Sequence, residues 1–255
     1  MIETIYRLPC PVGLALLADF HNSEPYPILR SLEKHRPEVI TIAGDLVFED
    51  NPGIKEYALL RGCAGIAPTY VSLGNHEWLL TAEDLEKIGA SGVILLHDRW
   101  ARYRGTVIGG LSSAFYTAYQ EVRAAHPEAG DYPISIRELH RYPIFPSLDW
   151  LDDFEKQDGY RILLCHHPEY YPKYLKGRPI DLILSGHAHG GQWRFRLPFS
   201  RKFFGVLAPG QGFFPRLTSG VKDGRLVISR GLSNPVRIPR INNEPEIVYI
   251  RPENG

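Results

Sequence analysis

Cysteine is scarce in this chain, and its few copies do not suggest a disulfide framework or a thiolate metal site. The 255 residues include three cysteines, Cys10, Cys63 and Cys165, which are scattered, odd in number and never in a Cys-x-x-Cys pair. We therefore expect neither structural disulfides nor a cysteine-bound zinc ion. Scattered free thiols are typical of a reducing compartment, which favours the cytoplasm.

An excess of charge of either sign is also absent. Lysine and arginine together number 29, as do aspartate and glutamate, so the formal net charge is zero. Binding along a nucleic-acid backbone needs a broadly basic surface. The balance therefore argues against a nucleic-acid partner, although it leaves room for local basic patches.

Long hydrophobic runs are missing too. The apolar run at residues 12–18 is too short to span a bilayer and has no basic leader before it, so we expect a buried strand there. An apolar content of 44% and a charged content of 23% are ordinary for a globular protein. We expect a single domain over residues 1–255. Residues 112–147 are rich in Tyr, Pro, Arg and His with weak periodicity, and we expect them to form an excursion over the functional site.

What the chain does contain is a repeated local pattern, a short apolar run that ends in polar, ligand-type residues. Such runs predict buried strands, and the segments between them predict helices, so the sequence favours an α/β fold with helices on both faces of the sheet. In such sheets ligands collect beyond the carboxyl ends of the strands. The runs with polar ends are 13–18, 38–43, 68–73, 161–165 and 181–185; two further strands are expected at 225–229 and 246–250, and helices at 27–35, 54–62, 81–88 and 148–156.

The most informative stretch is DLILSGHAHGGQ at residues 181–192, which ends an apolar run with two histidines one residue apart. Residues at this spacing do not share a helical face, but in an extended segment they point the same way. His187 and His189 can therefore face one cavity, and imidazole is the commonest side-chain ligand for a transition metal. The alternative, a pair of surface histidines, is weakened because the other strand ends supply further ligand types.

Taken together, these strand ends offer four imidazoles, two carboxylates and one amide oxygen. This set is too large for one tetrahedral ion and suits two adjacent ions, which favour in-line displacement at phosphorus. Mixed nitrogen and oxygen ligands favour manganese, iron or zinc over magnesium or calcium. The seven candidate metal ligands are Asp19, His21, Asp45, Asn75, His166, His187 and His189.

The same residues, in order, resemble the motifs of the calcineurin-like metallophosphoesterases. The later stretches HGGQWRFRLP and SRGL…PRINNEPEI resemble the bacterial YkuE- and YaeI-type phosphodiesterase subgroup, some members of which act on nucleotide-linked lipids or sugars. The resemblance implies a four-layer α-β-β-α sandwich of mixed sheets flanked by helices. The motifs are Asp19-Phe20-His21, Gly44-Asp45, Gly74-Asn75-His76-Glu77, His166-His167-Pro168 and Gly186-His187-Ala188-His189.

The resemblance also implies a role for each residue of the set. Asp19, His21 and His189 would hold one divalent ion, and Asn75, His166 and His187 the other. Asp45 would bridge the two ions, for which Mn²⁺ is favoured and Fe or Zn are alternatives. A hydroxide bridging the ions would then attack a phosphodiester or pyrophosphate bond. His76 would act as general acid or electrostatic stabiliser, or alternatively as a hydrogen-bonding neighbour of the ligands.

One position departs from the family pattern. Family members often carry an acid three residues after the bridging aspartate, where it orients the histidine of the Gly-Asn-His motif; here that position is Phe48. Either Glu77, Glu49 or Asp50 takes over that role, or His76 is held differently.

The alternatives to a diesterase are a phosphomonoesterase acting on a small molecule and a non-catalytic interaction module that retains the fold. The complete ligand set favours an enzyme.

The stretch at residues 193–204 interleaves basic and aromatic residues. Arg194 is a candidate substrate-binding residue that could hold a phosphate. The stretch as a whole could rest on an anionic membrane, or it could be an ordinary packed loop.

We expect the partner of the site to be a small phosphorylated molecule, nucleotide- or lipid-linked forms included. Members of the subgroup often have a membrane anchor before the first motif, and only about 18 residues precede Asp19 here, so we expect a cytoplasmic protein.

Overall fold

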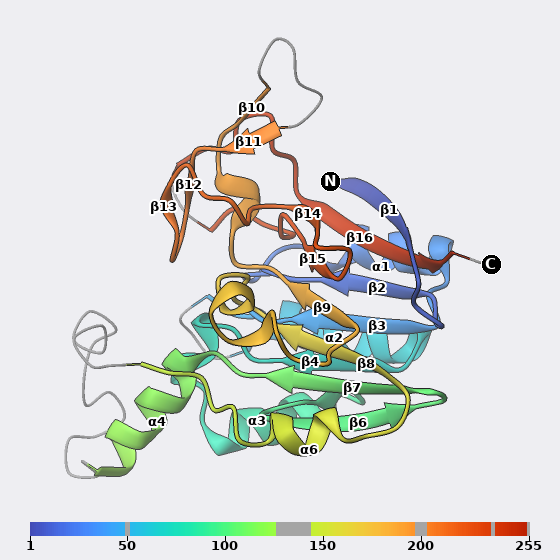
Figure 1. Ribbon diagram of the computed structural model, residues 1–255, viewed down its shortest axis with the longest axis vertical. Helices are drawn as coiled ribbons and strands as arrows, with labels where there is room; N and C mark the ends of the chain where they lie inside the picture. Colours follow the sequence, from blue (N-terminus) through green and yellow to red (C-terminus); the bar gives the residue numbers. More distant parts are fainter. Residues whose placement is uncertain (49–51, 126–143, 197–202, 236–237, 254–255) are drawn as a thin grey trace.

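Two six-stranded sheets pack face to face in the computed structural model of the protein (Figure 1). The structure describes residues 1–48, 52–125, 144–196, 203–235 and 238–253. The first sheet has the order β1-β16-β2-β3-β4-β5 and is parallel except where β16 meets β2. Its strands are β1 (Ile2–Leu8), β16 (Glu246–Pro252), β2 (Leu14–Leu17), β3 (Val39–Ala43), β4 (Thr69–Ser72) and β5 (Ile94–Leu95).

The second sheet has the order β14-β15-β9-β8-β7-β6, with antiparallel strands at both edges and parallel strands between them. Its strands are β14 (Gly220–Lys222), β15 (Leu226–Ile228), β9 (Leu182–Ser185), β8 (Tyr160–Cys165), β7 (Thr106–Leu111) and β6 (Arg99–Tyr103). Two small hairpins, β10–β11 and β12–β13, lie outside both sheets. Their strands are β10 (Arg194–Arg196), β11 (Phe203–Gly205), β12 (Leu207–Ala208) and β13 (Gly212–Phe213).

The apolar runs of the sequence become central strands because both of their faces are covered. Between the sheets, Leu16 and Ala43 from the first sheet share one buried cluster with Leu164, Leu184 and Val227 from the second. A strand buried on both faces needs apolar residues throughout, rather than an alternation of apolar and polar residues. The predicted runs therefore correspond to β2, β3, β4, β8 and β9 within one or two residues at each end.

Helices cover the outer faces of both sheets, which confirms the four-layer α-β-β-α sandwich of mixed sheets. The first sheet is covered by α1 (Pro25–His35), α2 (Ile54–Ile66) and α3 (Ala82–Ala90), and the second by α6 (Leu151–Glu155) and the short turn η3 (Tyr171–Leu175). The start of α3 follows from its sequence: Thr81 caps the helix by accepting the Asp84 N–H, and the Asp84 carboxylate accepts the Thr81 N–H.

The expected excursion over residues 112–147 begins as a regular helix, α4 (Ala114–Ala125), while residues 126–143 lie outside the described residues. This helix packs against the turn η1 (His76–Leu79), where the rings of Tyr119 and Trp78 meet edge to face with centroids 4.7 Å apart. The beginning of the excursion therefore supports the loop that carries His76. Among the described residues, no helix combines the length and the apolar character needed to cross a bilayer.

Candidate metal centre

The five predicted polar clusters all follow carboxyl ends of strands, three in the first sheet and two in the second. Five of the candidate ligands that follow these strands have an uncommon backbone conformation. Asp19, His21, Asp45, His187 and His189 have φ values of 54°, 43°, 56°, 64° and 44°. Side-chain-bearing residues seldom adopt positive φ, and clusters of such residues occur at functional sites. The loops thus turn sharply at the strand ends, and several of their side chains come within ligand distance of one another.

The turns after β3 and β4 lie so close together that only glycine fits at both. Gly44 has a φ of 82°, and a Cβ atom there would lie 2.6 Å from the backbone nitrogen of Gly74. A Cβ atom on Gly74 would lie 2.2 Å from Oδ1 of Asp45. These two glycines of the Gly-Asp and Gly-Asn-His motifs therefore let the Asp45 carboxylate lie directly against the neighbouring turn.

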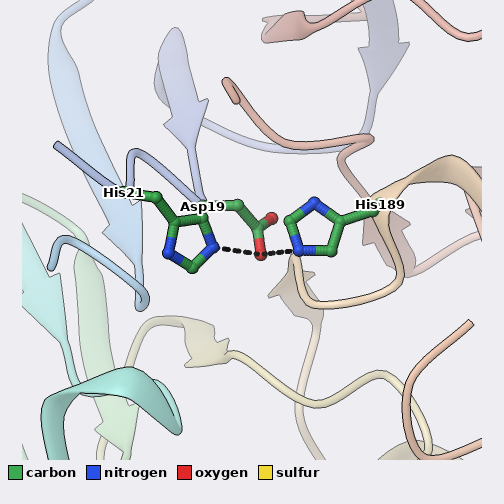
Figure 2. Close-up of side chains that lie close together, drawn as sticks. All are labelled: Asp19, His21 and His189. Atoms are coloured by element: carbon green, nitrogen blue, oxygen red, sulfur yellow. Dashed lines mark ion pairs between the residues drawn. The ribbon is translucent and has the colours of Figure 1, made fainter. Parts of the chain in front are cut away.

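The first group of candidate ligands is Asp19, His21 and His189, which Figure 2 shows with both imidazoles directed at the carboxylate. Oδ1 of Asp19 lies 4.0 Å from Nε2 of His21 and 3.6 Å from Nε2 of His189. The three side chains are buried, and one ligand atom from each lies within 4.8 Å of the others. Such spacing suits three ligands around one ion.

Asp45 connects this group to a second one. Its Oδ2 atom lies 3.5 Å from Nε2 of His21 and 3.1 Å from Nε2 of His166. Asp45, His166 and His187 again offer ligand atoms within 4.8 Å of one another. The structure thus brings together six of the seven predicted ligands, with one carboxylate between two groups.

Asn75, the seventh predicted ligand, lies at the start of the turn η1. Its two neighbours both contact Asp45, Gly74 through the close approach described above and His76 through its backbone N–H, which donates to Oδ1 at 3.0 Å. The Oδ1 atom of Asn75 is buried, and no hydrogen-bond partner for it exists among the described residues. A buried amide oxygen without a partner is costly unless something else binds it.

Two of the histidines are held so that one ring nitrogen faces the centre. Nδ1 of His166 lies 2.7 Å from the carbonyl oxygen of Ala43, and Nδ1 of His21 lies 3.0 Å from that of Val47. Because a carbonyl oxygen only accepts, both Nδ1 atoms are donors, and in the neutral ring Nε2 carries the lone pair. This outer hydrogen bond is the usual way in which a protein orients a metal-binding histidine.

The protonation of the group also suits metal binding. Burial lowers the pKa of His21 to about 4 and lowers those of His187 and His189, so these imidazoles are neutral at pH 7. Burial opposes charge on His166 and Asp45 as well, but their mutual attraction outweighs it. The pKa of His166 is raised to about 10, and that of Asp45 is held well below its usual value. A metal ion would replace the proton of His166.

Two buried carboxylates in this arrangement require positive charge. Asp19 and Asp45 are almost completely inaccessible to solvent, and within the described residues neither forms an ion pair with a lysine or an arginine. The Nε2 atom of His21, like Oδ1 of Asn75, is buried without a hydrogen-bond partner in the described part of the chain. Burying charge without a counter-charge is strongly unfavourable. The donor set, its charge and its unpartnered atoms thus fit divalent metal ions.

His76 lies at the edge of this group and is half-buried. Its Nε2 atom is 3.9 Å from Oδ2 of Asp45, and its ring meets that of His21 edge to face, with centroids 4.7 Å apart. It therefore lies next to the candidate ligands with one side toward solvent. This position suits a group that contacts substrate, and its predicted role as general acid stays a prediction.

Glu77, which the sequence suggests as a substitute for the missing acid, binds backbone N–H groups of two turns. Its carboxylate accepts backbone N–H groups of Gly74, Asp45, Leu46 and Val47 at 2.6 to 3.2 Å. Burial, followed by the nearby Asp45 charge, raises its pKa to about 7, and the N–H donors oppose this shift. Glu77 thus ties the turn after β3 to the turn after β4; Glu49 and Asp50 lie outside the described residues.

Sequence reasoning missed two residues of the C-terminal loop that hold the turn of His189. The Nδ2 group of Asn243 donates to the carbonyl oxygens of His189 and Gln192 at 2.7 and 3.1 Å. The Arg240 guanidinium lies 3.0 Å from Nδ1 of His189. Both lie within the stretch PRINN at residues 239–243, which the sequence marks only as part of the family resemblance. No local pattern near residues 240–243 connects them to a histidine some fifty positions earlier.

A third missed residue is Glu169, just after His166-His167-Pro168. Its Oε1 atom lies 3.3 Å from Nδ1 of His167 and 3.7 Å from Nε2 of His187. These three residues also offer ligand atoms within 4.8 Å of one another. His167 itself is held on its other side by Ser113, 2.9 Å from Nε2. Glu169 therefore adds a carboxylate beside the second group of candidate ligands.

Arg194 lies away from the candidate metal ligands. Its guanidinium stacks over the ring of Phe203 at 5.2 Å and lines a separate cavity of about 490 Å³ that also contains Tyr6, Arg230 and Glu246. The structure gives it no contact with the candidate ligands, and its role in substrate binding stays a prediction.

The chain is similar to known proteins over most of its length. The family model described as "Calcineurin-like phosphoesterase" matches residues 14–191, which contain all of the motifs quoted above. The uncharacterized protein YpbG of Bacillus subtilis is 27% identical over 92% of this chain and 79% of its own length. Phosphodiesterase YaeI of Escherichia coli is 24% identical over 94% of this chain and 82% of its own length. Among solved structures, a dimetal phosphatase from Danio rerio matches 86% of this chain and 87% of its own at 13% identity, with a TM-score of 0.43.

Proposed function

This chain belongs to the calcineurin-like phosphoesterases, and on that premise we propose that it hydrolyses a phosphodiester or pyrophosphate bond at a centre of two metal ions. Membership implies a hydrolase that acts on phosphoester bonds. The number of ions, the type of bond and the attack by a hydroxide bridging the ions are our proposal.

The observation that carries the proposal is the position of Asp45 between two groups of candidate ligands. One group consists of Asp19, His21 and His189, and the other contains His166 and His187. A carboxylate has two oxygens and can serve two ions at once, and the neighbouring imidazoles are 3.1 and 3.5 Å from the same Asp45 oxygen. Two adjacent ions form a clamp suited to displacement at phosphorus.

The residues available to hold the ions are those implied by the family resemblance, with Asn75 completing the second set. Mixed nitrogen and oxygen donors favour Mn²⁺, with Fe or Zn as alternatives, over Mg²⁺ or Ca²⁺. When bound, such ions would supply Lewis acidity to the phosphoryl oxygens and would lower the pKa of water held between them.

The protein's own residues contribute orientation and proton transfer. The outer hydrogen bonds of His21 and His166 direct a ring nitrogen of each toward the centre, and Glu77 fixes the turns that carry Asp45 and Asn75. We assign to His76 the role of holding or donating a proton at the leaving-group oxygen, because it adjoins the ligands and remains partly open to solvent.

A small substrate with more than one negative charge fits the surroundings. A cavity of about 640 Å³ has Glu169, a neighbour of His187, in its wall, and the same wall contains the cationic side chains of Lys173, Arg216 and Lys222. Such groups could hold a second phosphate or another anionic group of the substrate. The similarity to a protein named as a phosphodiesterase favours a diester over a monoester. The zero net charge continues to argue against nucleic acid.

The alternatives are a phosphomonoesterase and a non-catalytic scaffold. A scaffold that had lost its reaction would not need neutral, buried imidazoles around two buried carboxylates, so the complete set favours an enzyme. The monoesterase differs from our proposal only in the substrate, and the experiment below separates the two.

The test is metal analysis of the purified protein together with hydrolysis of bis-p-nitrophenyl phosphate and p-nitrophenyl phosphate in the presence of Mn²⁺. We expect about two equivalents of metal and faster turnover of the diester. A preference for the monoester would establish the alternative enzyme, and absence of metal with no turnover of either ester would contradict the proposal.

We further propose that the protein works in the cytoplasm. The support is that Cys10, Cys63 and Cys165 are all buried free thiols. Proteins exported to oxidising compartments commonly pair their cysteines. Fractionation of cells that produce the protein at native level would test this, and recovery in an extracytoplasmic fraction would contradict it.

A further inference from the structure

The two small hairpins carry an unusual set of exposed aromatic side chains. They extend from the upper part of the molecule in Figure 1, outside both sheets. Phe213 and Phe214, consecutive at the end of β13, are 76% and 70% exposed. We call the exposed aromatic residues of these hairpins the hairpin patch; its members are Trp193, Phe195, Phe203, Phe204, Phe213 and Phe214.

The β10–β11 hairpin presents aromatic rings on both of its faces. Phe195 and Phe204 are directly opposite each other in the ladder, with ring centroids 6.2 Å apart. Phe203 pairs with Arg196, one position along, so its ring points to the opposite face, where Arg194 stacks on it. A ribbon that buried one face against the protein would keep its rings on that face. Phe195, Phe203 and Phe204 are 42%, 49% and 36% exposed, so both faces of the ribbon present apolar surface to solvent.

The sequence segment that carries the patch contains charge of one sign only. Between Asp181 and Asp223 the sequence contains no aspartate or glutamate, in a chain that is neutral overall. Within that segment the described basic residues are Arg194, Arg196, Arg216 and Lys222. Arg196 and Arg216, which lie next to the patch in sequence, are exposed. A segment without acids that combines cations with aromatic rings is complementary to anionic headgroups above hydrocarbon.

The patch adjoins the candidate metal centre. Strands β11 and β12 both pack against the turn η4 (His189–Gly191), which begins with a candidate ligand. Phe214 and Arg216 also line the cavity whose wall contains Glu169. Whatever the hairpins rest on therefore lies close to the place where substrate would enter.

From these observations we infer that the hairpin patch docks on the surface of an anionic lipid bilayer. The aromatic rings enter the interfacial region while Arg196 and Arg216 pair with lipid phosphates. The docking is peripheral and reversible. It is independent of the proposed reaction, so a protein without phosphoesterase activity could still show it.

The experiment is sedimentation of the wild-type protein with vesicles of phosphatidylcholine alone or mixed with phosphatidylglycerol, at about 0.05 M and about 0.5 M salt. We expect binding to the anionic vesicles at low salt, with at least tenfold weaker binding to neutral vesicles and at high salt. No binding to anionic vesicles at low salt, or equal binding to both compositions, would overturn the inference.

Matched variants assign the binding to the patch. We expect Phe213→Ser/Phe214→Ser and Arg196→Glu each to weaken binding to anionic vesicles about tenfold or more. The controls are Tyr26→Ser/Ile54→Ser, which removes side chains 65% and 88% exposed on α1 and α2, and Arg61→Glu on α2. Circular dichroism checks that every variant is folded. Control variants that lose binding as much as the patch variants would overturn the inference. So would a wild-type dimer that becomes monomeric in Phe213→Ser/Phe214→Ser, because the patch would then bind a second copy of the chain.

Discussion

The ring of Phe48 stacks on the imidazole of His76, with ring centroids 5.0 Å apart and planes 24° from parallel. Phe48 occupies the position at which members of the resembled family often carry an acid. Among the described residues, an aromatic face therefore contacts His76 from the position where relatives often have a carboxylate.

Replacing His76 by alanine should retain both metal ions and slow diester hydrolysis about a hundredfold or more, the usual scale of general acid catalysis. If His76 donates a proton, the loss will be larger for a diester with a less acidic leaving alcohol than for a p-nitrophenyl ester. Turnover of both esters and metal content are measured, with His35→Ala on α1 as the control. An equal loss for the two leaving groups would rule out the acid role and favour electrostatic stabilisation.

Replacing Asp45 by asparagine should abolish activity and reduce the metal content of both sites. The amide keeps the size of the side chain but removes the negative charge placed between the two ligand groups. We expect at least a hundredfold loss of turnover even with excess Mn²⁺, with elemental analysis as the second readout. Asp158→Asn, at an exposed position, is the matched control. Full occupancy of one site in the Asp45 variant would show that the carboxylate does not serve both ions.

Replacing Glu77 by glutamine should destabilise the fold as well as the site. The carboxylate accepts four backbone N–H groups, and an amide would present its own N–H₂ group to some of these donors. We expect the free energy of unfolding to fall by about 2–4 kcal/mol. Chemical denaturation measures this, with Glu86→Gln on the exposed face of α3 as the control. A change below about 0.5 kcal/mol would mean that the turns hold their shape without Glu77.

Replacing Asn243 by alanine should weaken metal binding without touching any ligand. Its side chain holds the carbonyl oxygens of His189 and Gln192, so its loss frees the turn that carries His189. Loss of such outer contacts typically costs about 10–100-fold in metal affinity. Competition with a fluorescent chelator provides the measurement. The neighbouring Asn242→Gly, at a position with a φ of 51°, tests whether any change in this loop has the same effect.

Chelation should lower the thermal stability of the purified protein. Without cations, Asp19 and Asp45 remain buried with only imidazoles and the backbone N–H groups of His187 and His76 as partners. Ligand present at about a hundred times its dissociation constant contributes about 2.7 kcal/mol, or about 5–10 °C in Tm for a chain of this size. Differential scanning fluorimetry with EDTA, followed by Mn²⁺ or Ca²⁺, gives the measurement. Unchanged Tm after chelation, or equal recovery with Ca²⁺, would contradict the predicted nitrogen-rich site.

The parts of the site that could be predicted from sequence are those encoded locally. Asp19, Asp45 and His166 each follow an apolar run directly, and the rule that ligands collect at carboxyl ends of strands brings them together without any knowledge of the tertiary structure. The sequence predicts β2, β3, β4, β8 and β9 for the same reason, since burial on both faces leaves continuous apolar runs. The equally buried β7 is not among the predicted strands. Strand β1 was missed because it lies at a sheet edge and alternates half-buried with exposed residues.

The remaining features depend on contacts between distant segments. Asn243 and Glu169 act on His189 and His187 only because separate loops meet, and neither lies in a pattern that distinguishes it from an ordinary polar residue. Glu77 was noticed, but which atoms its carboxylate binds depends on the shape of two turns. That shape follows from the approach of Gly44 to Gly74, which composition and periodicity do not describe.

The positive φ angles of Asp19, His21, Asp45, His187 and His189 have a consequence for protein engineering. Copying the side chains of this centre onto another scaffold would not reproduce it, because most backbones cannot present non-glycine residues in that conformation at several strand ends. A transplant would have to include the turns themselves and the Glu77 carboxylate that ties two of them together. The unit that could be moved between proteins is thus the set of linked loops together with the side chains that they carry.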